Sequence, residues 1–198
     1  MKMQLHGKSR IAAEKRALCS TFGKHYLEFY RLAFLLTGDQ EQSIQAFGKA
    51  LNVEDAANLL LRGGKVSKAR RLVIAAALGA IAPELTDSVR RVERSRLEDV
   101  AYLGSLSSEN WVDVQNITRL EFEQAVLALD VFPRCALLLT VFERLSIQDT
   151  AILVGANEAM VRKAQRLGLI DLTRNIGRGR DVNSDYDAAV QLGGLQQA

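Results

Sequence analysis

The sequence has few of the residues that mark metal-binding and disulfide-rich proteins. Among 198 residues there are two cysteines, two histidines, two prolines and one tryptophan. Cys19 and Cys135 lie far apart, and neither they nor the histidines show a metal-ligand spacing, so we expect no metal site and no cofactor. Two isolated cysteines are typical of a protein kept in a reducing cytosol.

Long apolar runs and catalytic motifs are missing as well. The longest apolar run, Leu72 to Ala82, is too short to span a bilayer. Residues 1–10 lack the apolar core of a signal peptide. We therefore expect a cytoplasmic protein without a membrane partner. We find no nucleophile–base pair, phosphate-binding loop or paired carboxylates in a Gly-rich setting, so we do not expect an enzyme.

The residues that are abundant favour helices. Apolar residues make up 48% of the chain, which suffices for a core, and Ala, Leu, Arg, Glu and Gln are good helix formers. The sequence therefore predicts an all-α fold. Helical periodicity fades between Gly104 and Asn116, where small polar residues collect. We predict two small helical domains, residues 1–103 and 119–176, a linker at 104–118, and a flexible acidic tail at 177–198.

Residues 145–166, LSIQDTAILVGANEAMVRKAQR, predict two short helices joined by a tight turn. Gly155 falls where the chain must leave the first helix in a left-handed conformation, and Asn157 is a good N-cap for the second. Ala151 falls where the helices cross, and Val154 and Val161 face inward. This is the pattern of a helix-turn-helix whose second helix fits the major groove of DNA. A purely structural helical hairpin is the alternative.

The outward face of the second helix is basic and carries amides, so we assign it DNA contacts. The expected residues are Asn157, Glu158, Arg162, Lys163, Gln165 and Arg166. Thr150 and Ala164 occupy positions where a larger apolar side chain would pack better. Gly168 costs about 1 kcal/mol if the helix continues through it, and otherwise ends the helix.

Charge is segregated along the chain although the net charge is only +3. Residues 62–96 carry nine Lys/Arg and three acids, residues 97–133 one and seven, and residues 158–180 six and two. Two basic blocks around an acidic stretch indicate two contacts with a polyanion, or simply solvated helix faces. In the first block we assign phosphate contacts to Lys65, Lys68, Arg70 and Arg71.

The order of these features resembles the extracytoplasmic-function group of bacterial RNA polymerase sigma factors, over about residues 25–175. The resemblance rests on Tyr30-Arg31-Leu32-Ala33 and Thr37-Gly38-Asp39, on Leu129 to Arg134, and on Leu145-Ser146, Ala151, Gly155 and Val161. It implies a region 2-like domain followed by a region 4-like domain, and a sigma-like transcription initiation factor. The implied partners are promoter DNA, RNA polymerase core and an anti-sigma factor. The polymerase-binding residues that it implies are Asp39, Glu41, Ile44, Gln45 and Phe47.

Two departures from the family pattern weaken the expected activity. The helix from Gln40 to Phe47 has Glu41 as its one acid, where the family has an acidic motif that grips polymerase. Residues 62–82 contain no aromatic residue to stack on an unpaired base, an interaction worth about 1–3 kcal/mol. We therefore expect weak polymerase binding, through Ile44 and Phe47, and poor promoter melting. The alternatives are a DNA-binding regulator that never joins polymerase and a sigma-like interaction protein.

Overall fold

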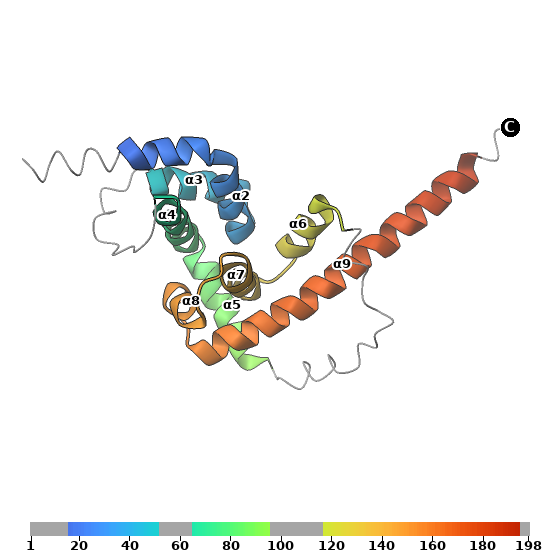
Figure 1. Ribbon diagram of the computed structural model, residues 1–198. Helices are drawn as coiled ribbons and strands as arrows, with labels where there is room; N and C mark the ends of the chain where they lie inside the picture. Colours follow the sequence, from blue (N-terminus) through green and yellow to red (C-terminus); the bar gives the residue numbers. More distant parts are fainter. Residues whose placement is uncertain (1–15, 52–64, 96–116, 195–198) are drawn as a thin grey trace, which may run out of the picture. The chain divides into compact units, whose positions relative to one another are not determined.

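A computed structural model describes residues 16–51, 65–95 and 117–194, with side chains described at 16–51, 66–95 and 117–177. Within these ranges the chain forms helices and the turns between them, with no strand, so the predicted all-α class is confirmed. The chain divides into two compact units, Met1–Glu84 and Leu85–Ala198 (Figure 1).

The division between the units lies earlier in the chain than the linker that we predicted. Most of helix α5 (Ala82–Arg94) belongs to the second unit, whereas the sequence placed it in the first domain. Its attachment depends on hydrogen bonds to residues about 40 positions away, which no local pattern predicts. The predicted linker at 104–118 falls almost wholly outside the described residues, and its role stays a prediction.

The first unit contains three helices, α2 (Tyr26–Thr37), α3 (Gln40–Leu51) and α4 (Lys65–Ala80), which pack pairwise against one another; residues 16–24 are helical before them. The break between α2 and α3 lies at Gly38 and Asp39, two of the residues on which the family resemblance rests. Gly38 ends α2 in the left-handed conformation, with φ 75°. The Asp39 carboxylate accepts a hydrogen bond of 2.8 Å from the Gln42 N–H, which caps the start of α3.

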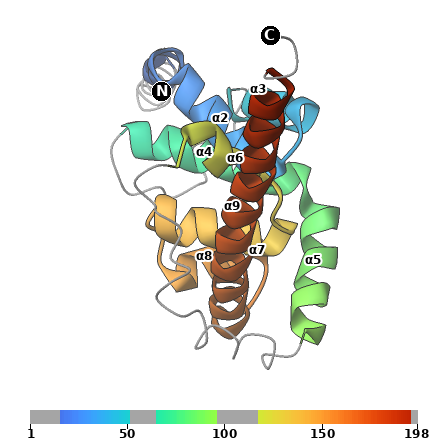
Figure 2. The ribbon, with the colours of Figure 1, turned by 90° about the vertical axis from the view of Figure 1, so that its right-hand side faces the viewer.

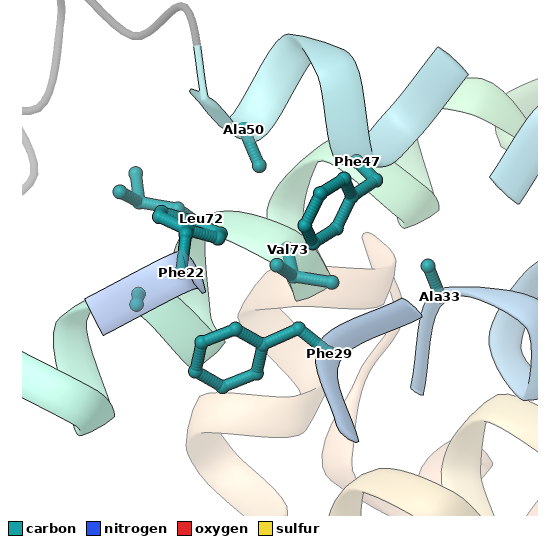
Figure 3. Close-up of a cluster of buried hydrophobic side chains, with 8 residues drawn as sticks. Phe22, Phe29, Ala33, Phe47, Ala50, Leu72 and Val73 are labelled. Atoms are coloured by element: carbon teal, nitrogen blue, oxygen red, sulfur yellow. The ribbon is translucent and has the colours of Figure 1, made fainter. Parts of the chain in front are cut away.

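Aromatic rings form the centre of the first unit. Phe22 packs edge-on against Phe29 and Phe47, with ring centroids 5.4 and 5.6 Å apart (Figure 3). Edge-to-face pairs of this kind add to the stabilisation that comes from burying the rings. The remaining buried members of this cluster are Ala33, Ala50, Ala69, Leu72 and Val73.

The second unit is built around one long helix, α9 (Glu158–Gly194). Helices α6, α7 and α8 all pack against α9, and Figure 2 shows it running past α7 and α8. Side chains cap three of the shorter helices: Thr118 and Glu121 form a capping box, and Asp130 and Ser146 accept from backbone N–H groups. These shorter elements are α6 (Arg119–Leu127), α7 (Val131–Leu137), the π-helix η5 (Leu138–Phe142) and α8 (Ile147–Val154).

The length of α9 corrects one expectation. We predicted a flexible acidic tail from residue 177, but the helix continues through Gly177 to Gly194. No proline interrupts this stretch. A single glycine inside a helix costs only about 1 kcal/mol, which a long helix tolerates. Gly168 likewise lies within α9 and does not end it.

A π-helical turn, which no pattern in the sequence indicates, joins α7 to the segment before α8. The Glu143 N–H bonds the carbonyl of Leu138, five residues back, at 2.9 Å. Arg144 follows with φ 54°, the one positive φ outside glycine among the described residues. The wide turn and this left-handed residue together end the helix and redirect the chain toward α8.

The described helices meet neither the requirements of a single membrane span nor those of a metal site. None of them alone is both long and apolar enough to cross a bilayer, and α4 and α5 pass only when taken together as a bent pair. In the same part of the chain, no three His, Cys, Asp or Glu side chains are grouped so that they could hold a metal ion.

Candidate nucleic-acid interface

The candidate interface is the α8–α9 corner, which we define as residues 146–166. Helix α8 starts at Ser146, whose hydroxyl accepts from the Asp149 N–H at 3.0 Å. It ends at Gly155, which has φ 67° and ψ 32°, the left-handed conformation that the sequence predicts there. The Asn157 side-chain oxygen accepts from the Met160 N–H at 2.8 Å and so caps the start of α9.

Small side chains close the crossing between the two helices. Thr150 and Ala151 of α8 and Val161 and Ala164 of α9 are all buried, and the two helices pack against each other. Thr150 and Ala164 are fully buried, so the two positions that we considered too small lie inside a close helix crossing. The Thr150 hydroxyl has no hydrogen-bond partner among the residues that the structure describes. A rigid crossing of this kind fixes the direction in which α9 leaves the turn.

Two arginines mark the outward side of α9. Arg162 and Arg166 lie one turn apart and are both exposed. Glu158 lies 3.7 Å from Arg162, with more than half of each side chain accessible to solvent. An exposed ion pair of this sort contributes little free energy, so it leaves Arg162 available to another anion. We call Glu158, Arg162 and Arg166 the α9 basic face.

Lys163 does not join this face as we expected. Its ammonium group donates to the backbone carbonyl of Ser95 at 2.5 Å and to that of Glu93 at 3.3 Å. Both carbonyls belong to the C-terminal end of α5, nearly 70 residues earlier in the chain. In this conformation the predicted DNA contact of Lys163 is replaced by a contact within the protein.

The side chain of Gln165 is also hydrogen-bonded within the protein. Its amide donates to the Thr140 hydroxyl at 3.1 Å, and Thr140 in turn donates to the Ala136 carbonyl at 2.6 Å. Gln165 is half-buried, so reading a base edge would require this chain of hydrogen bonds to break. The predicted base contact is therefore not available in this conformation, because Gln165 lies on the side of α9 that faces η5.

The four basic residues predicted to hold phosphates all lie in α4. Arg70 forms an ion pair with Glu28 of α2, so its charge is matched inside the first unit. Lys68 and Arg71 are half-buried, and Lys65 begins the helix, with its side chain outside the description. Two of the four thus remain partly open to solvent, and Arg70 already has an acidic partner.

Helix α3, which was predicted to bind polymerase, exposes only some of the residues that were expected to make this contact. The Asp39 carboxylate caps the helix, and Glu41 accepts a hydrogen bond of 3.3 Å from the Gln45 amide. Ile44 is 54% exposed, whereas Phe47 is 8% exposed and belongs to the aromatic core. The assignment of Phe47 to a binding surface was therefore wrong, because packing against Phe22 uses its ring.

The structure adds a set of contacts that the sequence did not reveal, which we call the Asp130 junction. Both guanidinium hydrogen bonds of Arg91 end on the Asp130 carboxylate, at 2.6 and 3.1 Å. The buried Ser88 hydroxyl donates to the same carboxylate at 2.8 Å and accepts from the Phe132 N–H at 2.8 Å. These contacts join α5 to the start of α7.

Opposing effects act on the Asp130 carboxyl. Burial by itself raises its pKa, but hydrogen bonds from Arg91, Ser88 and the Val131 N–H outweigh burial and hold the pKa below its usual value. The carboxylate therefore stays charged and keeps its partners at neutral pH. Asp130 could have been identified from the sequence as an N-cap, but its α5 partners could not.

Comparison with protein-family models, with curated proteins and with solved structures finds no match to this chain in any of the three. Of the residues predicted to bind DNA whose side chains the structure describes, Arg162 and Arg166 are the two basic ones that are exposed. They lie directly beyond a tight, capped turn between two helices.

Proposed function

We propose that this chain is a sigma-like transcription initiation factor. In this proposal the α8–α9 corner acts as a helix-turn-helix that binds promoter DNA, and the first unit associates with RNA polymerase core. The observation that supports it best is the pair Arg162 and Arg166, exposed one turn apart on α9 directly after the left-handed turn at Gly155. A recognition helix in the major groove uses its N-terminal turns in this way.

The chemistry of the corner suits a polyanion. Arginine binds phosphate or the O6 and N7 acceptors of guanine through two parallel hydrogen bonds. The N-terminus of α9 adds a partial positive charge that also favours phosphate. Glu158, in the first turn, can accept from the amino group of cytosine, so the α9 basic face contains both phosphate-binding and base-reading groups.

A second candidate is a DNA-binding regulator that does not melt promoters, and the first unit favours it. Helix α3 has Glu41 as its one acid, and Phe47 is buried. Helix α4 has no aromatic residue that could hold an unpaired base. The shortage of acids on α3 weakens binding to polymerase, and the lack of aromatic residues in α4 weakens promoter melting. Neither affects the α9 basic face.

Double substitution of the arginines tests the DNA contact. Arg162→Ala/Arg166→Ala should weaken binding to a labelled duplex and reduce the slope of log affinity against log salt by about two, about one for each lost phosphate contact. Fluorescence anisotropy over a salt series measures both. Arg119→Ala/Arg174→Ala is the matched control, because these arginines are equally exposed, pair locally with acids, and lie away from the corner.

The control should keep most of the affinity and the salt slope although it loses the same charge. Equal effects of the two double variants would show that only net charge matters, and would argue against a defined interface at the corner. Retention on immobilised core polymerase, followed by permanganate footprinting of a promoter, then separates the initiation factor from the regulator. Only the former binds core and opens DNA.

A further inference from the structure

The C-terminal end of α5 holds Lys163, a side chain that the sequence assigned to DNA. The last carbonyls of a helix lack partners within the helix and carry partial negative charge. At the end of α5, the Ser95 hydroxyl donates to the Val92 carbonyl at 2.8 Å, and Lys163 donates to the carbonyls of Glu93 and Ser95. An ammonium group held on two oxygens has the kind of partners that a DNA phosphate would supply.

This contact lies beside the proposed DNA-binding surface. Lys163 follows Arg162 directly and precedes Arg166 by three residues, so all three leave the same part of α9. The carbonyl end of α5 therefore lies next to the α9 basic face, within the second unit. Two of the three ammonium N–H groups of Lys163 are used at the end of α5, so DNA phosphates and the end of α5 compete for this side chain.

Helix α5 is attached through a narrow surface. Its buried side chains are Leu85, Ser88 and Val92, and the rest of the helix is largely exposed. It also packs less extensively on its neighbours than α7 packs on α9. The Asp130 junction and Lys163 both provide polar attachments for it. An element held by few contacts undocks more readily than the core around it.

We propose that docked α5 is an autoinhibitory cover that keeps Lys163 from DNA, and that the Asp130 junction is its latch. The inference rests on the proposed function of the corner. When only a fraction of molecules has α5 undocked, the apparent dissociation constant is the intrinsic one divided by that fraction. Weakening the latch therefore strengthens DNA binding, although the residues changed touch no DNA.

Two neighbouring arginines on α5 allow a matched test. Arg91→Ala removes the arginine contacts of the latch and leaves those of Ser88, whereas Arg90→Ala removes the same charge from an exposed pair with Asp87 on α5 itself. If only the net charge matters, the loss of one positive charge in either variant should weaken DNA binding slightly. The cover predicts that Arg91→Ala tightens binding about two- to fivefold, the range that loss of one exposed ion pair allows, while Arg90→Ala does not. Anisotropy with the full chain and a labelled duplex measures both.

Acetylation of Lys163 provides a readout that does not involve DNA. A short pulse of an N-hydroxysuccinimide ester, followed by mass spectrometry, should label Lys163 slowly in the wild type and in Arg90→Ala. Labelling should be faster in Arg91→Ala. Arg91→Lys keeps the charge but loses the two-point geometry, so it should change both readouts in the same direction by less. Thermal melting shows whether each variant is folded, and Arg91→Lys replaces Arg91→Ala if the latter is not.

Several results would overturn the cover. Tighter binding in both Arg90→Ala and Arg91→Ala, or in neither, would show that the latch does not control access to DNA. Lys163 labelling that is equally fast in all the proteins would show that α5 does not shield it. An unchanged salt slope in Arg162→Ala/Arg166→Ala is a different failure, because it removes the proposed function and the inference with it.

Discussion

Thr140 and Thr150 in the second unit differ in how well their hydroxyl groups are satisfied. Thr140 both donates to the Ala136 carbonyl and accepts from Gln165. Thr150 is fully buried at the α8–α9 crossing, and its hydroxyl has no hydrogen-bond partner in the described part of the chain. A buried hydroxyl without a partner costs about 1–3 kcal/mol of stability, so the same residue type stabilises at one site and destabilises at the other.

Replacing each threonine by valine, which has nearly the same shape, tests this difference. Thr150→Val should raise the free energy of unfolding by about 1 kcal/mol, because it removes the unpaired hydroxyl and creates no cavity. Thr140→Val should lower it, since it breaks two hydrogen bonds. Urea denaturation followed by circular dichroism measures both. A loss of stability in Thr150→Val would mean that its hydroxyl has a partner after all.

At the scale of elements, the crossing of α7 and α9 depends on a residue with no side chain. A Cβ atom at Gly168 would lie 2.9 Å from the Pro133 carbonyl oxygen, closer than real Cβ atoms approach a backbone atom. The apparent weakness of a glycine inside α9 is therefore a packing requirement. The sequence left open whether Gly168 ends the helix, because the close approach involves a proline 35 residues earlier.

Two glycines of the same helix should respond oppositely to alanine. Gly168→Ala should destabilise the second unit by about 1–3 kcal/mol, since α7 and α9 must move apart. Gly177→Ala should be neutral or stabilising by up to about 1 kcal/mol, because its Cβ position has no described atom within 4 Å apart from the adjoining residues and backbone of α9 itself, and alanine is the better helix former. Differential scanning calorimetry compares them, and similar melting temperatures for the two variants would contradict the close crossing.

For the whole molecule, the proposed function needs a surface on the first unit that polymerase can bind. Helix α3 provides Ile44 and Gln45 on its exposed side, whereas Phe47 and the amide oxygen of Gln42 are buried. Neutral amides bring no long-range attraction to a basic surface. We therefore expect association with core polymerase to be weak, with Ile44 as its main apolar contact.

An added charge at Gln45 tests this view of polymerase binding. Gln45→Glu should strengthen retention on core polymerase a few-fold, mainly through faster association, because a rim charge acts chiefly on the association rate. Gln124 is exposed on α6, so Gln124→Glu makes the same change in the other unit and should have no effect on retention. Surface plasmon resonance at two salt concentrations measures both. Equal effects of the two variants would place the polymerase contact elsewhere or nowhere on this chain.

The sequence alone determined the helical class and the places where helices break. Gly38 and Gly155 take the left-handed conformation, and Asn157 caps its helix, because these features depend on residues within one turn. The end of α9 was missed, since glycines and acids in its second half indicate a loop but do not prevent a helix.

The tertiary structure decided which way the functional side chains point. The sequence predicted that Lys163 and Gln165 face outward, but they bond to α5 and η5. It also predicted that Phe47 contacts polymerase, but this ring packs against Phe22. In each case the partner lies about 25 to 70 residues away in the sequence. Helical periodicity places a residue on a face of its helix, but only the packing of distant segments determines whether that face meets solvent, DNA or the protein itself.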